Sequence, residues 1–144
     1  MTTTEIDLTG LNPAQSTTVG DGYPSRAVDG TTNGLYIFNS CTHTAIETDP
    51  WWRVELPKRH VIAEVVLYNH IDSCCMWKLS PVYVYVQESS VDTLCGSHTT
   101  SSVGLALLNF TCPAPIPGDM LWVEVRGQVK WVTICELKAY GWKY

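Results

Sequence analysis

The chain shows the two-residue alternation of apolar and polar positions that is typical of β-strands. Trp52, Val54 and Leu56 alternate with more polar neighbours, and the stretches 82–86 and 121–126 repeat the pattern. Successive side chains of a strand point to opposite faces of its sheet, so one face of each stretch is apolar. These stretches therefore predict strands that each bury one face.

Other segments extend the same pattern to the whole chain. The run 61–68 is apolar and rich in β-branched residues, which predicts a strand buried on both faces, and 131–140 predicts a closing strand. No segment has a sustained helical period. We therefore expect one all-β domain over residues 1–144, a two-sheet sandwich or β-jelly roll. Stretches rich in Gly, Pro, Ser and Thr are predicted to connect the strands, at 12–34, 87–104 and 113–119.

Composition narrows the class of protein. The 144 residues carry a net charge of −5 with only nine Lys and Arg residues, which argues against nucleic acid as a partner. No run approaches the length of about 18 apolar residues that a membrane span needs. Residues 1–10 lack the basic start and apolar run of a signal peptide, so we expect a mature form whose leader has been removed. The loops 12–34 and 35–50 are long enough to carry function.

The cysteine content predicts an extracellular protein. Six cysteines are an even number, as in a disulfide framework, although six allow 15 connectivities. The triplet Asn109-Phe110-Thr111 is an N-glycosylation sequon and agrees with secretion.

Two of the cysteines, Cys74 and Cys75, are neighbours. We expect them to be bonded to each other, although each can also pair with another cysteine or remain a thiol. A bond between neighbours would close almost no loop and so would add little stability. Its use would be local, as a rigid apolar knob of two sulfurs beside His70, Asp72 and Lys78. Such a surface suits a sugar, which has an apolar face and a hydroxylated edge.

An enzyme is the first alternative. Cys74 or Cys75 with His70 or His43 would supply a nucleophile and a base. A thiolate beside a second cysteine would oxidise outside the cell, and no oxyanion-type glycine turn stands out. The chain also lacks paired Cys-x-x-Cys and His-x-x-x-His spacing for zinc. We therefore expect no catalysis.

Five segments, taken together and in order, resemble an F-type lectin (fucolectin) domain. The resemblance extends from about Ile6 to Gly141 and implies a jelly roll of the galactose-binding, discoidin-like type that contains calcium and binds terminal L-fucose. The rival reading is a discoidin-like module with another glycan specificity, or one that binds a membrane surface or protein, for which Trp77 is a candidate contact. The segments are 14–16 (AQS), 27–30 (AVDG), 40–44 (SCTHT), 49–56 (DPWWRVEL) and 135–137 (CEL).

The family's sugar site has a histidine, then Arg-x-Asp, then Arg or Lys. His43 and Asp72 match this pattern, whereas His70 stands where the family has arginine. The last basic residue of the family pattern would fall on position 77, whereas Lys78 lies one position further along. If this chain carries one inserted residue, most simply Ser73, then Lys78 matches the last basic residue of the family. The resemblance therefore implies fucose binding by His43, His70 and Lys78, with Asp72 orienting the basic residues.

A methyl group distinguishes fucose and calls for an apolar pocket. The sulfurs of Cys74 and Cys75 are expected to supply it, with loop residues Val19, Tyr23 and Tyr36.

The resemblance also implies disulfides and a structural Ca²⁺ ion. Cys41 would pair with Cys135 and Cys95 with Cys112, each bond adding about 3–5 kcal/mol of stability in the chain-entropy account. Calcium would bind carboxylate and hydroxyl oxygens as well as backbone carbonyls, which suit a hard cation. The expected ligands are Asp29, Ser40 and Glu136 by their side chains and Arg26, Thr31 and Cys135 by their carbonyls.

The resemblance further implies a secreted protein with a role in innate defence. A shallow monosaccharide site binds weakly, so we expect a homo-oligomer that gains avidity from several sites. Contact with membranes would occur only through surface glycans. The sequence leaves open which fucosylated glycan is preferred and whether the Asn109 sequon is used.

Overall fold

The computed structural model describes residues 2–30, 40–69, 79–102 and 105–144. Within these ranges the chain forms strands and one short 3₁₀ helix, which confirms the predicted all-β class. None of the described helices is long and apolar enough to cross a membrane. In chain order the elements are β1 (Thr4–Ile6), β2 (Ala14–Gln15), η1 (Pro24–Val28), β3 (Trp51–Asn69), β4 (Val82–Glu88), β5 (Val91–His98), β6 (Leu107–Val125) and β7 (Ile134–Lys143).

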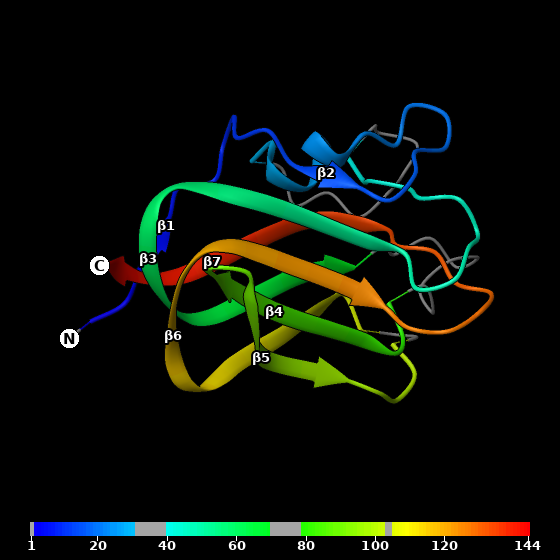
Figure 1. Cartoon of the computed structure of the whole chain (residues 1–144). Coiled ribbons are helices and arrows are strands. Elements are labelled where there is room, and N and C mark those ends of the chain that lie inside the picture. The colour runs from blue at the N-terminus through cyan, green and yellow to red at the C-terminus, as the bar shows by residue number, and fades with distance from the viewer. Residues whose placement is uncertain (1, 31–39, 70–78, 103–104) are drawn as a thin grey trace.

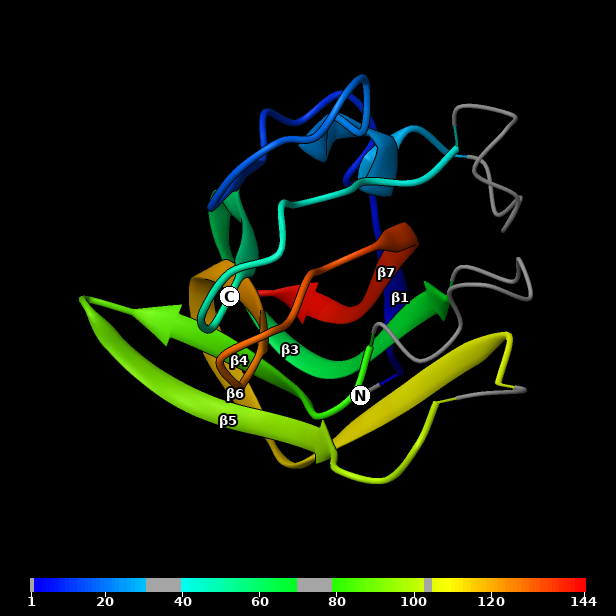
Figure 2. The same ribbon diagram turned by 90° about the vertical axis from the view of Figure 1, so that its right-hand side faces the viewer.

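The strands β3 and β6 are long and curved, and each contributes to both layers of the sandwich (Figures 1 and 2). The strand order is β1-β7-β3-β6-β4-β5, and β2 pairs with the start of β3. Up to Glu55, β3 lies between β2 and the end of β6; from His60 onward it lies between β7 and the first part of β6. The register shifts between Glu55 and His60, where the strand bends from one layer to the other.

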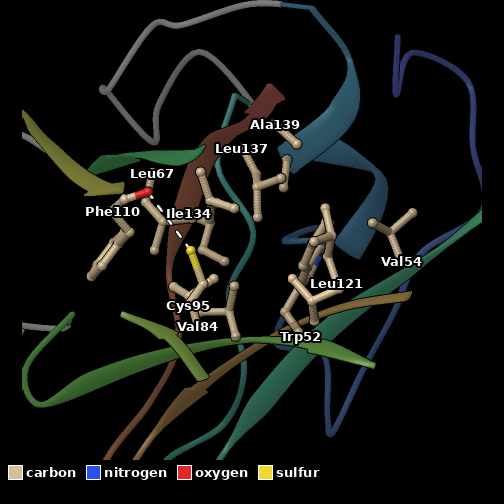
Figure 3. Packing of buried hydrophobic residues seen from close by; sticks show 14 of the residues in the cluster. Trp52, Val54, Leu67, Val84, Cys95, Phe110, Leu121, Ile134, Leu137 and Ala139 are labelled. Atoms are coloured by element: carbon tan, nitrogen blue, oxygen red, sulfur yellow. Dashed lines mark hydrogen bonds between the residues drawn. The ribbon is translucent and has the colours of Figure 1, made fainter. Parts of the chain in front are cut away.

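The core fills the space between the layers, as the alternation predicted (Figure 3). Trp52, Val84 and Leu121 of one layer and Leu67 and Leu137 of the other are at most 1% exposed. The Trp52 indole N–H, which burial would otherwise leave without a partner, donates to Pro24 O at 2.9 Å. This bond joins the region of η1 to the core.

Four details of the predicted strands and connections were wrong. The segments 51–56 and 61–68 belong to one strand, and the closing strand begins at Ile134 instead of residue 131. The expected connection 87–104 contains β5, whose mostly exposed and polar side chains hide its strand character. The expected connection 113–119 lies inside β6.

The prolines of β6 explain the last of these differences. Ile62 pairs with Ile116 and Glu64 with Thr111, so the residues between Thr111 and Ile116 form a bulge opposite β3. Pro113 and Pro115 lie in this bulge, where no ladder hydrogen bond needs their missing N–H groups.

Candidate functional site

His43 lies in an extended segment that runs beside the start of β7. The neighbours of His43 fix this segment: the Thr42 N–H donates to Ile134 O at 2.9 Å, and the Thr44 N–H donates to Val132 O at 3.0 Å. Both threonine hydroxyls accept in return, from the Ile134 N–H at 2.9 Å and from the Val132 N–H at 2.8 Å. Both threonines are fully buried, so the alternation directs the His43 side chain to the opposite side.

A disulfide secures the same segment covalently. Cys41 is bonded to Cys135 with an S–S distance of 2.03 Å, as the resemblance implied. The second implied bond, between Cys95 of β5 and Cys112 of β6, is present as well. The first bond holds the residues before His43 against β7.

The backbone of His43 is also bound on its other side. The His43 N–H donates to Gly22 O at 2.9 Å, and the Val19 N–H donates to His43 O at 2.9 Å. The ring atom Nδ1 lies 2.6 Å from Thr44 O. A carbonyl oxygen can only accept, so Nδ1 carries the hydrogen and Nε2 carries the lone pair of the neutral ring. The half-buried imidazole is therefore held in one orientation and one tautomer.

The remaining residues predicted to bind the sugar, Tyr36, His70, Asp72, Cys74, Cys75 and Lys78, lie outside the described residues. The structure does place the point at which their segment leaves β3. Asn69 is buried and pairs with Ile134, the residue that also binds Thr42. The side-chain amide of Asn69 donates from Nδ2 to Leu105 O at 2.9 Å and to Ser102 O at 3.3 Å. Asn69, the last described residue before position 70, therefore lies one strand away from the segment of His43.

A second polar cluster lies where η1 meets β7. Glu136 is only 4% exposed, and its Oε2 accepts the Gly30 N–H at 3.1 Å. Burial and the nearby Asp29 carboxylate raise the pKa of Glu136 to about 8, with burial as the larger cause. Among the described residues no donor reaches the other oxygen, Glu136 Oε1. Two adjacent carboxylates with an unpartnered buried oxygen form a site that a cation would stabilise.

The other expected calcium ligands surround this pair only in part within the described residues. Ser40 is buried and precedes the cysteine that is bonded to Cys135, so the disulfide brings it towards Glu136. Arg26 donates from Nη1 to Cys41 O at 3.4 Å and pairs with Asp21 at 3.3 Å. Thr31 lies outside the described residues.

The described side chains fit a calcium site in chemistry but do not complete it. No group of three or more His, Cys, Asp and Glu side chains that could hold a metal occurs in the described part of the chain. The oxygens of Asp29, Ser40 and Glu136 suit Ca²⁺, which requires additional carbonyl or water oxygens to reach its usual six to eight ligands. The full set of six residues stays a prediction.

Sequence reasoning missed the roles of Thr42 and Thr44. The signal was present as two threonines flanking His43 in the segment after Cys41. Their partners lie about 90 positions away, so the reciprocal hydrogen bonds were not visible in the sequence.

Comparison with known proteins agrees with this arrangement. Residues 26–119 match the family described as NedA-like, galactose-binding domain. Fucolectin-4 of Anguilla japonica is 29% identical over 121 residues, which cover 81% of this chain and 66% of that protein. Fucolectin of Anguilla anguilla is 30% identical over 98 residues, 65% of this chain and 61% of that protein. The chain therefore spans about two thirds or less of the length of these relatives.

Solved structures show the same fold. The lectin domain of lectinolysin, complexed with Lewis b antigen, is 27% identical with a TM-score of 0.81, covering 91% of this chain and 92% of that one. The F-lectin from striped bass (Morone saxatilis) serum is 26% identical with a TM-score of 0.84, covering 92% of this chain and 47% of that one. These relatives are named as lectins, in agreement with the expectation that the chain carries no catalysis. The chain belongs to the NedA-like galactose-binding domain family, and its similarity to the fucolectins confirms its resemblance to the F-type lectins.

Proposed function

We propose that this chain binds L-fucose, or the terminal fucose of a glycan, at the end of the sandwich where His43 lies. The observation that carries the proposal is the fixed imidazole of His43, whose backbone is bonded on both sides and whose tautomer is set by Thr44 O. A neutral imidazole with one committed N–H offers its other nitrogen to a sugar hydroxyl. The fucolectins and the Lewis b complex support the same class of ligand.

His70 and Lys78 are proposed to complete the site as hydrogen-bond donors, with Asp72 orienting them. The support for this assignment is the position of Asn69, which precedes His70 in the chain and pairs with Ile134, the residue that also binds Thr42. Cys74, Cys75 and Tyr36 are proposed to contact the methyl group of fucose.

We further propose that Ca²⁺ binds between η1 and β7 and stabilises the loops around the sugar site without contacting the sugar. Its support is the buried Glu136 beside the carboxylate of Asp29, with Glu136 Oε1 accepting no hydrogen bond from the described residues. The ion would neutralise both carboxylates and tie the end of η1 to β7. The hydrogen bond from Gly30, two residues after the end of η1, to Glu136 of β7 already joins the same two regions.

Secretion, self-association and a role in innate defence complete the proposal. Two disulfides within the described residues and the serum origin of the striped-bass relative support an extracellular location. Several weak sites acting together would supply the avidity that glycan recognition requires.

Isothermal titration with L-fucose tests the proposal. His43→Ala is expected to weaken binding about 10-fold, the loss that corresponds to one hydrogen bond between neutral groups of roughly 0.5–1.5 kcal/mol. His98→Ala, which removes a histidine of β5, is the matched control and should bind as the wild type does. The proposal would be overturned if the wild-type protein does not bind L-fucose, or if the His43→Ala variant binds it with wild-type affinity.

A further inference from the structure

The outer face of one layer carries large flat side chains in a row. Trp122 of β6 pairs with Arg53 of β3 on one side and with Tyr85 of β4 on the other. All three are half-buried, whereas their strand neighbours Leu121 and Val84 point into the core. These aromatic rings therefore lie on the outside of the sheet, where the core does not require them.

Arg53 holds Trp122 in place. Its guanidinium carbon lies 5.0 Å from the ring centroids of both Trp51 and Trp122, and these two centroids are 5.1 Å apart. A cation in contact with two indole rings restrains both of them. The Trp122 ring is therefore positioned before any ligand arrives.

A hollow of about 370 Å³ lies beside Trp122 on the same face. This volume is within the range of roughly 300–1,000 Å³ that is usual for small-molecule sites. Trp122 and Tyr85 supply aromatic surface, and the charged side chains of Asp92, Glu124 and Arg126 complete the lining.

The polar groups of the hollow are already oriented. Arg126 donates from Nε to Glu124 Oε1 at 2.8 Å and from Nη2 to the Tyr85 hydroxyl, and Gln87 donates to Asp92 Oδ1 at 2.9 Å. Because a guanidinium can only donate, the Tyr85 oxygen accepts and its own hydrogen points elsewhere. No described residue accepts that hydrogen or donates to the second oxygen of Glu124 or of Asp92.

The charges select the class of ligand. One guanidinium and two carboxylates line the hollow, so an anionic ligand meets net repulsion. A neutral sugar has hydroxyls that donate to Glu124 and Asp92, oxygens that accept from Tyr85, and an apolar face that packs on Trp122. We propose that this hollow is a second subsite, which binds a neutral hexose unit of an oligosaccharide. This subsite proposal depends on the proposed function in one respect only, which is that both take the ligand to be a glycan.

NMR titration tests the subsite separately from the His43 site. The probe is lacto-N-neotetraose, a neutral tetrasaccharide without fucose, added to ¹⁵N-labelled His43→Ala protein. We expect shifts in the amides of residues 83–85 and 122–126 and in the Trp122 indole N–H. Tyr85→Phe and Asp92→Asn should each weaken this binding about 10-fold, as expected for the loss of one hydrogen bond. Glu55→Gln, which changes an exposed carboxylate of the neighbouring strand, should leave binding unchanged.

The outcomes separate the two proposals. L-fucose that shifts residues 41–44 of the wild type while the tetrasaccharide leaves 83–85 and 122–126 unmoved would overturn the subsite and leave the proposed function standing. Tetrasaccharide binding at Trp122 with no response of 41–44 to L-fucose would uphold the subsite and overturn the proposed function. Unchanged tetrasaccharide affinity in both Tyr85→Phe and Asp92→Asn would also overturn the subsite. So would a cationic peptide that shifts the Trp122 signals when the tetrasaccharide does not.

Discussion

The Gly30 N–H donates to Glu136 Oε2 at 3.1 Å, joining residues that lie 106 positions apart. This hydrogen bond favours the charged form of the Glu136 carboxyl, but burial and the adjacent Asp29 outweigh it. The carboxyl consequently prefers to bind a proton or, as proposed above, a cation.

The first prediction concerns stability in the absence of calcium. The pKa of Glu136 is about 8 in the folded protein, compared with a reference value of 4.5. Between these two values the folded state binds more protons than the unfolded state, so the free energy of unfolding should fall as pH rises from about 5 to 8. Urea unfolding in chelator at several pH values measures this slope. Glu136→Gln should remove this group's share of the slope, and identical slopes in variant and wild type would contradict the assignment.

The second prediction is that calcium raises the melting temperature at neutral pH. A ligand that binds only the folded state adds about 2.7 kcal/mol when its concentration is 100 times its Kd. Asp29→Asn and Glu136→Gln should abolish the response in a thermal scan with and without chelator, whereas Glu55→Gln, an exposed carboxylate, should retain it. A wild-type melting temperature that does not respond to chelator would argue against the ion.

The third prediction concerns the support of His43. Thr44→Val removes the hydroxyl that accepts the buried Val132 N–H, which should cost about 1–3 kcal/mol of stability and weaken binding of L-fucose. Thr44→Ser keeps the hydroxyl and is the matched control. Chemical denaturation and fucose titration of both variants check the effect, and equal stability of the two would refute it.

The fourth prediction concerns the packing of β7 against β3. A Cβ atom at Gly141 would lie 1.9 Å from Val61 O, which is far inside van der Waals contact. Gly141→Ala should therefore lower the free energy of unfolding by about 3 kcal/mol or more, because the clash is with backbone. Gly10→Ala, where the space is open and only the positive φ of 79° resists, should cost about 1 kcal/mol. Denaturant midpoints of the two variants give the comparison.

The fifth prediction follows from His70 at the position of a family arginine. Histidine changes charge near neutral pH, so L-fucose affinity should depend on pH between about 5 and 8. His70→Arg supplies a permanently charged, planar donor and should strengthen binding, whereas Lys78→Ala should abolish it. Calorimetric titration decides this, and loss of binding in His70→Arg would show that the site is built around histidine.

The strands that could be predicted are those that bury one whole face. Val82, Val84 and Val86 alternate cleanly and form β4 as expected. The edge strand β5 was missed because the residues from Val91 to Leu94 are all exposed and give no alternation. The curvature of β3 was also hidden, because a bend between layers depends on the packing of partner strands.

The sequence predicted which residue types form the candidate site, but it did not predict the hydrogen bonds that hold them in place. His43 and Glu136 could be named from their local sequence, since His43 lies two positions after Cys41 and Glu136 directly follows Cys135. The backbone partners of His43, Gly22 and Val19, lie on a separate loop. Hydrogen bonds between such distant segments are set by the fold and leave no local pattern.

The bond between Cys41 and Cys135 has a mechanical consequence. If the sugar binds at His43, as proposed above, a pull on the bound glycan enters the chain near His43. From there it passes two residues along the backbone, then through the disulfide into β7, without relying on the hydrogen bonds that pair neighbouring strands. A force applied at β7 would therefore reach the segment of His43 through covalent bonds. Under such a force we expect the sugar to dissociate before the strands of the sheet separate.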